Sequence, residues 1–228
     1  MAIKEYQSTS TFEKIELGKA ISKKIKIEKD EWYITMIGSP DSQSRHYDEC
    51  EAAGGSIDKM VIIDRCRTTL EKNIKEHRDN LSHRGNPTFI CCDVNEFLKT
   101  WDNTKKIGVI DFDGTSPASS YHLDLANNAK RLNAKFLIIV TTQRDRMCKV
   151  LLELGKNLPQ VWRRSYIRKE QQEVDRDGYY KNNYSKWGWW SPVCKEILRA
   201  CLNKMGLNTI LTCEYKGVGK MSATVYAL

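Results

Sequence analysis

Four aspartates stand directly after, or close to, the ends of short apolar segments of this 228-residue chain. These are Asp64, Asp93, Asp111 and Asp113. Apolar segments without polar alternation are typical of strands buried on both faces of a parallel sheet. Ligands of open α/β sheets bind outside the carboxyl ends of the strands, so we expect these carboxylates to line one crevice. Carboxylates placed there can accept hydrogen bonds, hold a cation or act as general bases.

The elements that must position these aspartates follow an alternating pattern. Five apolar segments of high β propensity cover residues 32–37, 60–63, 88–92, 107–110 and 136–140. Apolar residues recur at helical spacing in 11–26, 68–80 and 119–133. Strands that alternate with helices in this way predict a doubly wound, mostly parallel α/β sheet.

The C-terminal part departs from the alternation. A helix is predicted over 193–205, with Ser191 as its N-cap and Pro192 at its first position. Two further segments, 209–215 and 222–228, flank a turn that contains Gly217 and Gly219, which predicts an antiparallel hairpin. We therefore expect a seven-stranded, mostly parallel sheet with an antiparallel C-terminal hairpin, in a single domain over 1–228.

This order of elements, from about Glu31 to Leu228, resembles the class I S-adenosylmethionine-dependent methyltransferases. The middle of the chain is most similar to the tRNA guanine-N2 methyltransferases, in which an acid after one strand binds the cofactor ribose and a later aspartate lies by the adenine. The corresponding strings here are VIIDR, ending at Arg65, and CDV, ending at Val94. The string IDFDGTSP, from Ile110 to Pro117, resembles the family's D-P-[FY]-G-[ST]-P stretch, although its Asp-Pro pair is absent.

The resemblance implies S-adenosylmethionine as the cofactor and 31–160 as the cofactor-binding core. The implied cofactor-binding residues are Gly38, Ser39, Pro40, Asp64, Arg65, Asp93, Val94 and Asp111. The loop after the first strand has one glycine where the family usually has several. Asp64 and Asp93 each have an alternative interpretation as the N-cap of the helix that follows.

The resemblance implies a catalytic role for Asp113, with Asp111 as the other candidate. A carboxylate beside an acceptor amine can localise its lone pair and later take its proton. We expect the side chains of Asp111 and Asp113 to point to opposite sides of the segment, and Phe112 between them to stack on a flipped base. A turn rich in Asp and Gly is the structural alternative.

The same aspartates allow a different chemistry. The string DFDGT, from Asp111 to Thr115, matches the D-x-D-G-T motif of phosphatases, in which carboxylates hold magnesium. That motif normally follows the first strand of its domain, whereas here it follows the fourth. The eight cysteines and four histidines form no paired zinc-ligand pattern, so no metal is expected.

Residues 161–190 are rich in aromatic and basic side chains, and they form an insertion between the fifth strand and the final part of the chain, 191–228. Basic side chains bind phosphates and aromatic rings stack on exposed bases. The expected substrate-binding residues are Phe112, Arg163, Arg164, Trp187, Trp189 and Trp190. A net charge of +8 agrees with a nucleic-acid partner, RNA or DNA, although a protein-contact surface is the alternative.

The sequence therefore predicts a methyltransferase that acts on a base nitrogen of nucleic acid. A catalytically inactive module of the same fold, which binds nucleic acid or a protein, is the main alternative, and a small-molecule methyltransferase is a third. No apolar segment is long enough to span a membrane, and residues 1–30 contain a helical extension and no apolar signal block. Together with unpaired core cysteines, this predicts a cytoplasmic protein.

Overall fold

The computed structural model describes residues 12–113, 118–142, 146–148, 173–174, 179–181, 190–216 and 220–228. Its centre is a seven-stranded sheet with the strand order β3-β2-β1-β4-β5-β10-β9. The strands are β1 (Trp32–Thr35), β2 (Met60–Ile63), β3 (Thr88–Ile90), β4 (Ile107–Phe112), β5 (Phe136–Thr142), β9 (Asn208–Lys216) and β10 (Lys220–Ala227). The first five strands pair in parallel, and β10 runs antiparallel to both of its neighbours, β5 and β9. The predicted sheet and its C-terminal hairpin are confirmed.

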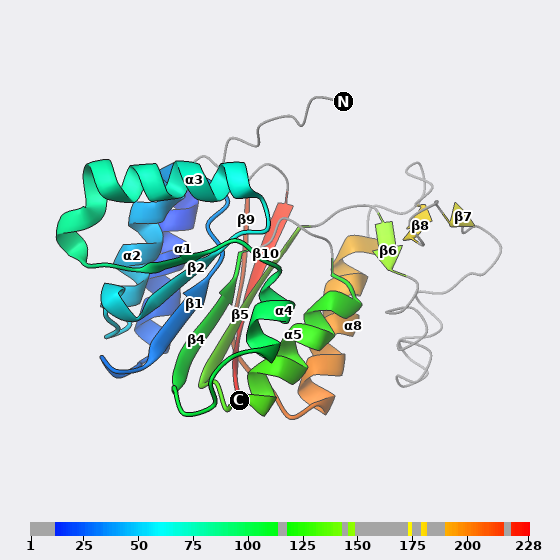
Figure 1. The fold of residues 1–228 in the computed structure, drawn as a ribbon. Coiled ribbons are helices and arrows are strands. Elements are labelled where there is room, and N and C mark those ends of the chain that lie inside the picture. The colour runs from blue at the N-terminus through cyan, green and yellow to red at the C-terminus, as the bar shows by residue number, and fades with distance from the viewer. Residues whose placement is uncertain are drawn as a thin grey trace.

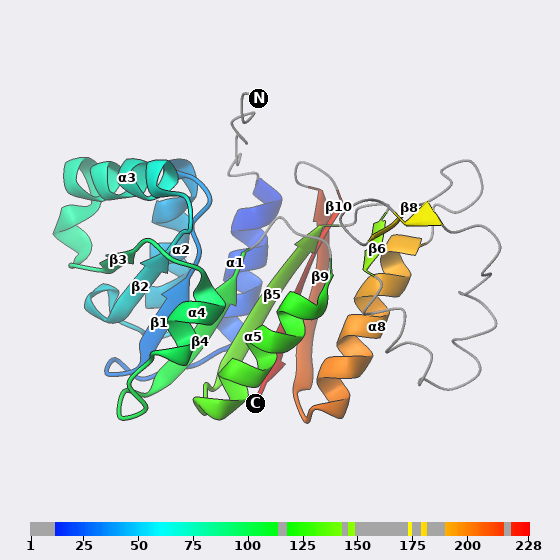
Figure 2. The same ribbon diagram turned by 45° about the vertical axis from the view of Figure 1, so that its right-hand side comes forward.

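Helices cover both faces of the sheet (Figures 1 and 2). One face carries α1 (Phe12–Lys24), α2 (Gln43–Ala52) and α3 (Arg67–Glu76), and the other carries α4 (Val94–Lys99), α5 (Ser120–Arg131) and α8 (Trp190–Lys204). Short helical turns connect them: η1 (Pro40–Ser42), η2 (Ile57–Lys59), η3 (His77–Leu81) and η4 (Ser82–Arg84). A separate small sheet has the order β6-β8-β7, with β6 (Arg146–Cys148), β7 (Glu173–Val174) and β8 (Tyr179–Lys181).

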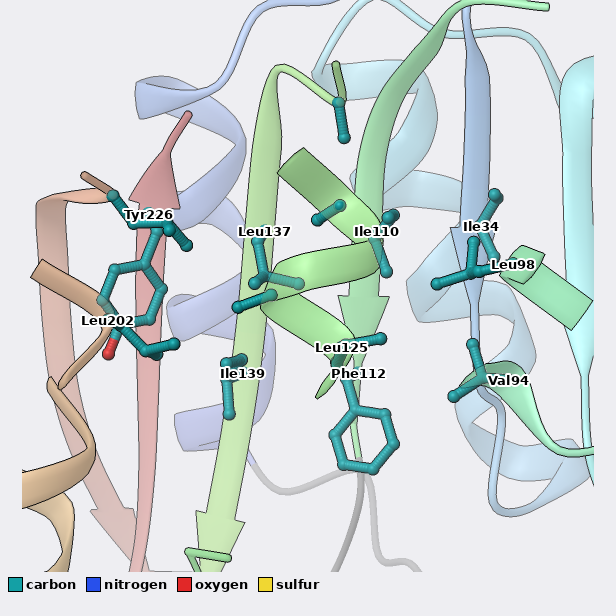
Figure 3. Packing of buried hydrophobic residues seen from close by; sticks show 14 of the residues in the cluster. Ile34, Val94, Leu98, Ile110, Phe112, Leu125, Leu137, Ile139, Leu202 and Tyr226 are labelled. Atoms are coloured by element: carbon teal, nitrogen blue, oxygen red, sulfur yellow. The ribbon is translucent and has the colours of Figure 1, made fainter. Parts of the chain in front are cut away.

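Side chains alternate between the two faces along each strand, and in β1, β2 and β4 both sets are buried, apart from the half-buried Trp32. On β4, Val109 packs under α1 and α2, whereas Ile110 and Phe112 pack under α4 and α5. Figure 3 shows this second layer, where Leu202 of α8 and Tyr226 of β10 extend it across the sheet. Burial on both faces explains why the strands appear in the sequence as unbroken apolar segments.

Three features of the fold differ from the expectation. Helix α2 was not predicted, because its buried side chains include the polar residues Gln43, His46 and Glu49. Helix α8 begins at Trp190, so Ser191 and Pro192 lie within its first turn, and the N-cap assignment of Ser191 is wrong. The small sheet was not predicted either. Among the described residues, no helix is both long and apolar enough to cross a membrane.

His122 is a fully buried histidine at the start of α5. Its Nδ1 accepts the backbone N–H of Ser119 at 3.1 Å, and its Nε2 is buried without a partner among the described residues. The ring lies edge-on to Phe112, with centroids 5.3 Å apart. Burial lowers the pKa of His122 to about 4, from an ordinary value of 6.5.

This lowered pKa predicts an acid-sensitive stability. Below about pH 6.5 the unfolded chain binds a proton at His122 that the folded chain does not bind until about pH 4. The free energy of unfolding should therefore fall across this window, by on the order of 3 kcal/mol from this residue. In a His122→Gln variant that part of the slope should disappear, as measured by urea unfolding between pH 7 and 4.5. A His83→Gln change at an exposed histidine serves as the control, and an equal slope in both variants would contradict the assignment.

Candidate functional site

The carboxyl ends of β1, β2, β3 and β4 lie at one edge of the sheet (Figure 1). Thr35 pairs with Asp111 across β1 and β4, and Ile63 pairs with Ile90 across β2 and β3. Asp64 and Asp93 therefore leave the sheet at the same edge as Asp111. The side chains of the four predicted acids nevertheless meet different surroundings.

Asp64 follows β2 and is half-buried. Its Oδ1 accepts the backbone N–H of Cys66 at 2.7 Å, while Oδ2 has no hydrogen-bond partner within the described residues. Burial raises the pKa of Asp64, against the effects of the Cys66 N–H and of the neighbouring Arg65, whose side chain is exposed. Asp64 thus both holds the turn after β2 and offers an open acceptor.

The loop after β1 leaves space beside its single glycine. A methyl group added to Gly38 would meet no atom within 4 Å. The next residue, Ser39, is buried and its Oγ has no partner in the described part of the chain. Its carbonyl accepts both the N–H and the hydroxyl of Ser42, which fixes η1, the turn that begins at Pro40. The loop therefore combines open space with an unsatisfied buried hydroxyl.

Asp93 is the N-cap of α4. Its Oδ1 accepts the N–H groups of Asn95 at 2.8 Å and Glu96 at 3.3 Å, and its Oδ2 accepts the hydroxyl of Tyr121 at 2.9 Å. Val94 is a core residue. The structure shows the capping role that was the alternative for Asp93. An adenine amino group would have to compete with Tyr121 for this carboxylate.

Asp111 and Asp113 point to the same side of β4, toward α2. The expectation that they point to opposite sides is wrong, because side chains two residues apart in a strand share a face. Phe112 takes the other face (Figure 3) and is 5% exposed. Its ring packs against the rings of Tyr121 and His122. Its predicted stacking on a base is also wrong, because the ring is part of the core.

The two aspartates belong to a polar cluster beneath α1. Asp111 accepts hydrogen bonds from the hydroxyls of Tyr33 at 3.3 Å and Thr35 at 3.2 Å, and its Oδ2 lies 3.2 Å from Nδ1 of His46. Arg45 donates from one nitrogen to Oε1 of Glu49 at 2.6 Å and from another to Oδ2 of Asp113 at 3.0 Å. We call these seven residues the Arg45 cluster.

Burial strongly affects the charges of this cluster. It raises the pKa of Glu49. The charges of Arg45 and His46 lower this pKa, and the charge of Asp111 raises it further. It also raises the pKa of Tyr33, to which Asp111 adds. For Arg45, burial acts to lower the pKa, but the nearby carboxylates outweigh it, so that the guanidinium stays charged.

A small cavity of about 20 Å³ lies beside the cluster, with room for about one water molecule. It is lined by Lys14, Leu17, Ile21, Arg45, His46, Glu49, Asp111, Asp113, Ile138 and Val140. Helix α1 lies very close here, since a methyl group on Gly18 would contact Oε1 of Glu49. The hydroxyl of Ser22 bonds to the carbonyls of Gly18, at 2.8 Å, and Glu49, at 3.3 Å.

Several predicted residues cannot be placed. Residues 114–117, Arg163, Arg164, Trp187 and Trp189 lie outside the described residues, and only the backbone of Trp190 is described. Conversely, five residues of the Arg45 cluster were not predicted from the sequence: Tyr33, Thr35, Arg45, His46 and Glu49. The available signal was the histidine and glutamate three residues apart after the first strand, which places both on one helix face.

Removal of the buried cation should be costly. An Arg45→Met change leaves the buried Glu49 and the partly buried Asp113 without their partner, so the free energy of unfolding should fall by about 3–5 kcal/mol. Arg78→Met is the matched control, because Arg78 is 70% exposed and pairs with Asp79, and its change should stay within about 0.5 kcal/mol. Urea unfolding measures both. Equal small losses would show that the Arg45 pairs contribute little.

No protein-family model matches the chain, and no curated protein matches it either. Solved structures do match. An O-methyltransferase from Bacillus cereus in complex with SAH aligns over 98% of this chain and 84% of its own, with TM-score 0.53 and 8% identity. Sp1610 of Streptococcus pneumoniae, to which a tRNA (m1A22) methyltransferase activity has been attributed, aligns over 95% and 70%, with TM-score 0.51 and 10% identity. An uncharacterized protein from Listeria monocytogenes serotype 4b aligns over 96% and 68%, with TM-score 0.53 and 11% identity.

At these identities the likeness establishes the fold. The chain has the fold of the class I methyltransferases, with the strand order and the reversed β10 described above. None of the three structures is named as a tRNA guanine-N2 methyltransferase, so that finer resemblance stays a prediction.

Proposed function

We propose that this protein is an S-adenosylmethionine-dependent methyltransferase that acts on nucleic acid, at a base nitrogen. The observation that carries the proposal is Asp64. It stands at the carboxyl end of β2 in a sheet of the class I methyltransferase order, with one carboxylate oxygen engaged by Cys66 and the other open. An acceptor in that position suits the two hydroxyls of a ribose.

The residues at this edge fit the cofactor in part. Asp64 would accept the ribose hydroxyls, and each such bond to a charged acceptor contributes about 1.5–3 kcal/mol. The loop from Gly38 to Pro40 would face the methionine part, where the open space and the unsatisfied Ser39 hydroxyl lie. Asp93 fits less well, because both of its oxygens are already bonded. The cofactor supplies a methyl group activated by the sulfonium charge.

We assign to Asp113 the role of the carboxylate that contacts the methyl-accepting amine. It is the more exposed of the two aspartates at the end of β4, with 16% of its side chain accessible against 4% for Asp111. A carboxylate at the mouth of the site can orient an amine and take its proton as the methyl group transfers. Asp111, bonded to two hydroxyls and next to His46, instead holds the end of β4 in place.

Nucleic acid is the proposed substrate on the basis of charge and composition. The net charge of +8 favours encounter with a polyanion, and the insertion 161–190 supplies Arg163 and Arg164 for phosphates and Trp187, Trp189 and Trp190 for stacking. The activity attributed to Sp1610 is on tRNA, which favours RNA among the nucleic acids.

The ion pair between Arg45 and Asp113 favours a second candidate function. A carboxylate held at 3.0 Å by a buried guanidinium is less available to an acceptor. The alternative is therefore an inactive module that binds nucleic acid or a protein through the same surface.

The cofactor part of the proposal predicts a specific loss of affinity. An Asp64→Asn change keeps the shape of the side chain but removes its charge, so SAH should bind at least about tenfold more weakly. Asp30→Asn, an exposed change at the opposite edge of the sheet, should leave the affinity unchanged. Isothermal titration calorimetry measures all three proteins. No heat with the wild type at millimolar SAH would overturn the proposal.

Transfer of a labelled methyl group to RNA and to DNA separates the enzyme from the inactive module. An active enzyme should label RNA, and Asp113→Asn should lower the rate by about 100-fold or more while the RNA is still bound in a filter assay. Labelling of DNA alone would correct the choice of substrate. Binding of RNA and SAH without any transfer would favour the inactive module.

A further inference from the structure

We propose that the Arg45 cluster is a binding site for a divalent transition-metal ion, with His46, Glu49 and Asp111 as its ligands. The three side chains are buried, and one ligand atom of each lies within 4.8 Å of the others. The proposal concerns the face of the sheet under α1 and does not depend on the cofactor site.

The distances between ligand atoms suit a metal. Nδ1 of His46 lies 3.2 Å from Oδ2 of Asp111 and 3.6 Å from Oε2 of Glu49. Metal–ligand bonds of about 2.0–2.2 Å at tetrahedral or octahedral angles separate neighbouring ligand atoms by about 3.0–3.6 Å. Both distances from His46 fall in this range, and the ligand oxygens of Glu49 and Asp111 lie within 4.8 Å of each other.

Other contacts of the ligands orient them within the cluster. Glu49 uses Oε1 for Arg45 and turns Oε2 toward His46. Asp111 accepts the hydroxyls of Tyr33 and Thr35 at Oδ2, the same oxygen that faces Nδ1 of His46, so a bound metal would share this oxygen with the two hydroxyls. Hydrogen bonds of this kind are what position ligands around protein-bound metals.

The charges of the cluster also favour a cation. An NH2 nitrogen of Arg45 lies 3.0 Å from Nε2 of His46, and since a guanidinium can only donate, Nε2 is the acceptor of this contact. One guanidinium then faces three carboxylates, those of the buried Glu49 and Asp111 and of the partly buried Asp113. Buried charges are normally paired or bound to a metal, and a divalent ion would bring this set to neutrality.

Asp113 lies where it could accept the second ring N–H of a metal-bound His46. Its Oδ2 lies 3.8 Å from Nε2 of His46. Metal-bound histidines usually donate their second ring N–H to a carboxylate. With a metal on Nδ1, the proton would move to Nε2 and point to Asp113, and Arg45 would give up its contact with the ring. The cavity beside the cluster, about 20 Å³, leaves a position for one water ligand.

An imidazole with two carboxylates suits Zn²⁺ or Co²⁺ better than Mg²⁺, which prefers oxygen ligands alone. The test uses the full chain after EDTA treatment, titrated with Zn²⁺ by calorimetry. We expect one equivalent to bind, with a Glu49→Gln variant at least about tenfold weaker. Glu51→Gln is the control on the same helix, because Glu51 is exposed and pairs with Arg84 instead.

Exposed Cys66 and Cys91 are competing zinc ligands, and Co²⁺ distinguishes them. Nitrogen and oxygen ligands give weak visible bands, whereas thiolates add intense near-ultraviolet absorption. Thermal unfolding of the wild type with and without Zn²⁺ decides the case even where Glu49→Gln fails to fold, since binding to the native state must raise the Tm. Absence of binding, unchanged affinity in Glu49→Gln, or a thiolate spectrum would each overturn the proposal. If no metal binds, the negative charges of the three carboxylates would instead be balanced by bound protons and by Lys14, which lines the cavity.

Discussion

The ion pairs of Arg45 fix the relation between helix α2 and the end of β4. The guanidinium reaches Glu49 one turn along its own helix and Asp113 sixty-eight residues away. Removal of each of these charges from water costs several kcal/mol, which is recovered only when the partners meet at short distance. Helix α2 must therefore lie where both contacts form, and the loop from Gly38 to Ser42, which leads into it, is placed by the same requirement.

This constraint divides the carboxyl edge of the sheet into two regions. Asp64 and Asp93 lie at the ends of β2 and β3, where they hold turns through backbone N–H groups. Asp111 and Asp113 turn beneath α1, where side chains surround them. The loop after β1 lies between the two regions and belongs to both. A ligand bound by Asp64 and a substrate group near Asp113 would therefore approach each other next to Gly38. This is the one position in the loop without a side chain.

The central strands were predictable because they are buried on both faces, which leaves the unbroken apolar composition of segments such as Met60–Ile63. The position of Asp64 at the carboxyl edge of the sheet was predictable for the same reason, since it marks the end of such a segment. Helix α2 was not, because the residues that it buries include Gln43, His46 and Glu49, and a polar buried face gives no hydrophobic periodicity. Two partners of this helix, Asp111 for His46 and Asp113 for Arg45, lie more than sixty residues further along the chain, and local patterns carry no information on such pairs.

Asp113 is the residue that both proposed sites share. Its carboxylate accepts from Arg45 at 3.0 Å and lies 3.8 Å from the ring of His46, so its orientation depends on which of the two donates to it. In the arrangement described here, the guanidinium donates to the ring and to the carboxylate together. A metal bound to Nδ1 of His46 would move the ring proton to Nε2. The imidazole would then donate a hydrogen bond to Asp113. Arg45 and His46 can therefore set the direction of the Asp113 carboxylate, which we assign to the methyl-accepting amine.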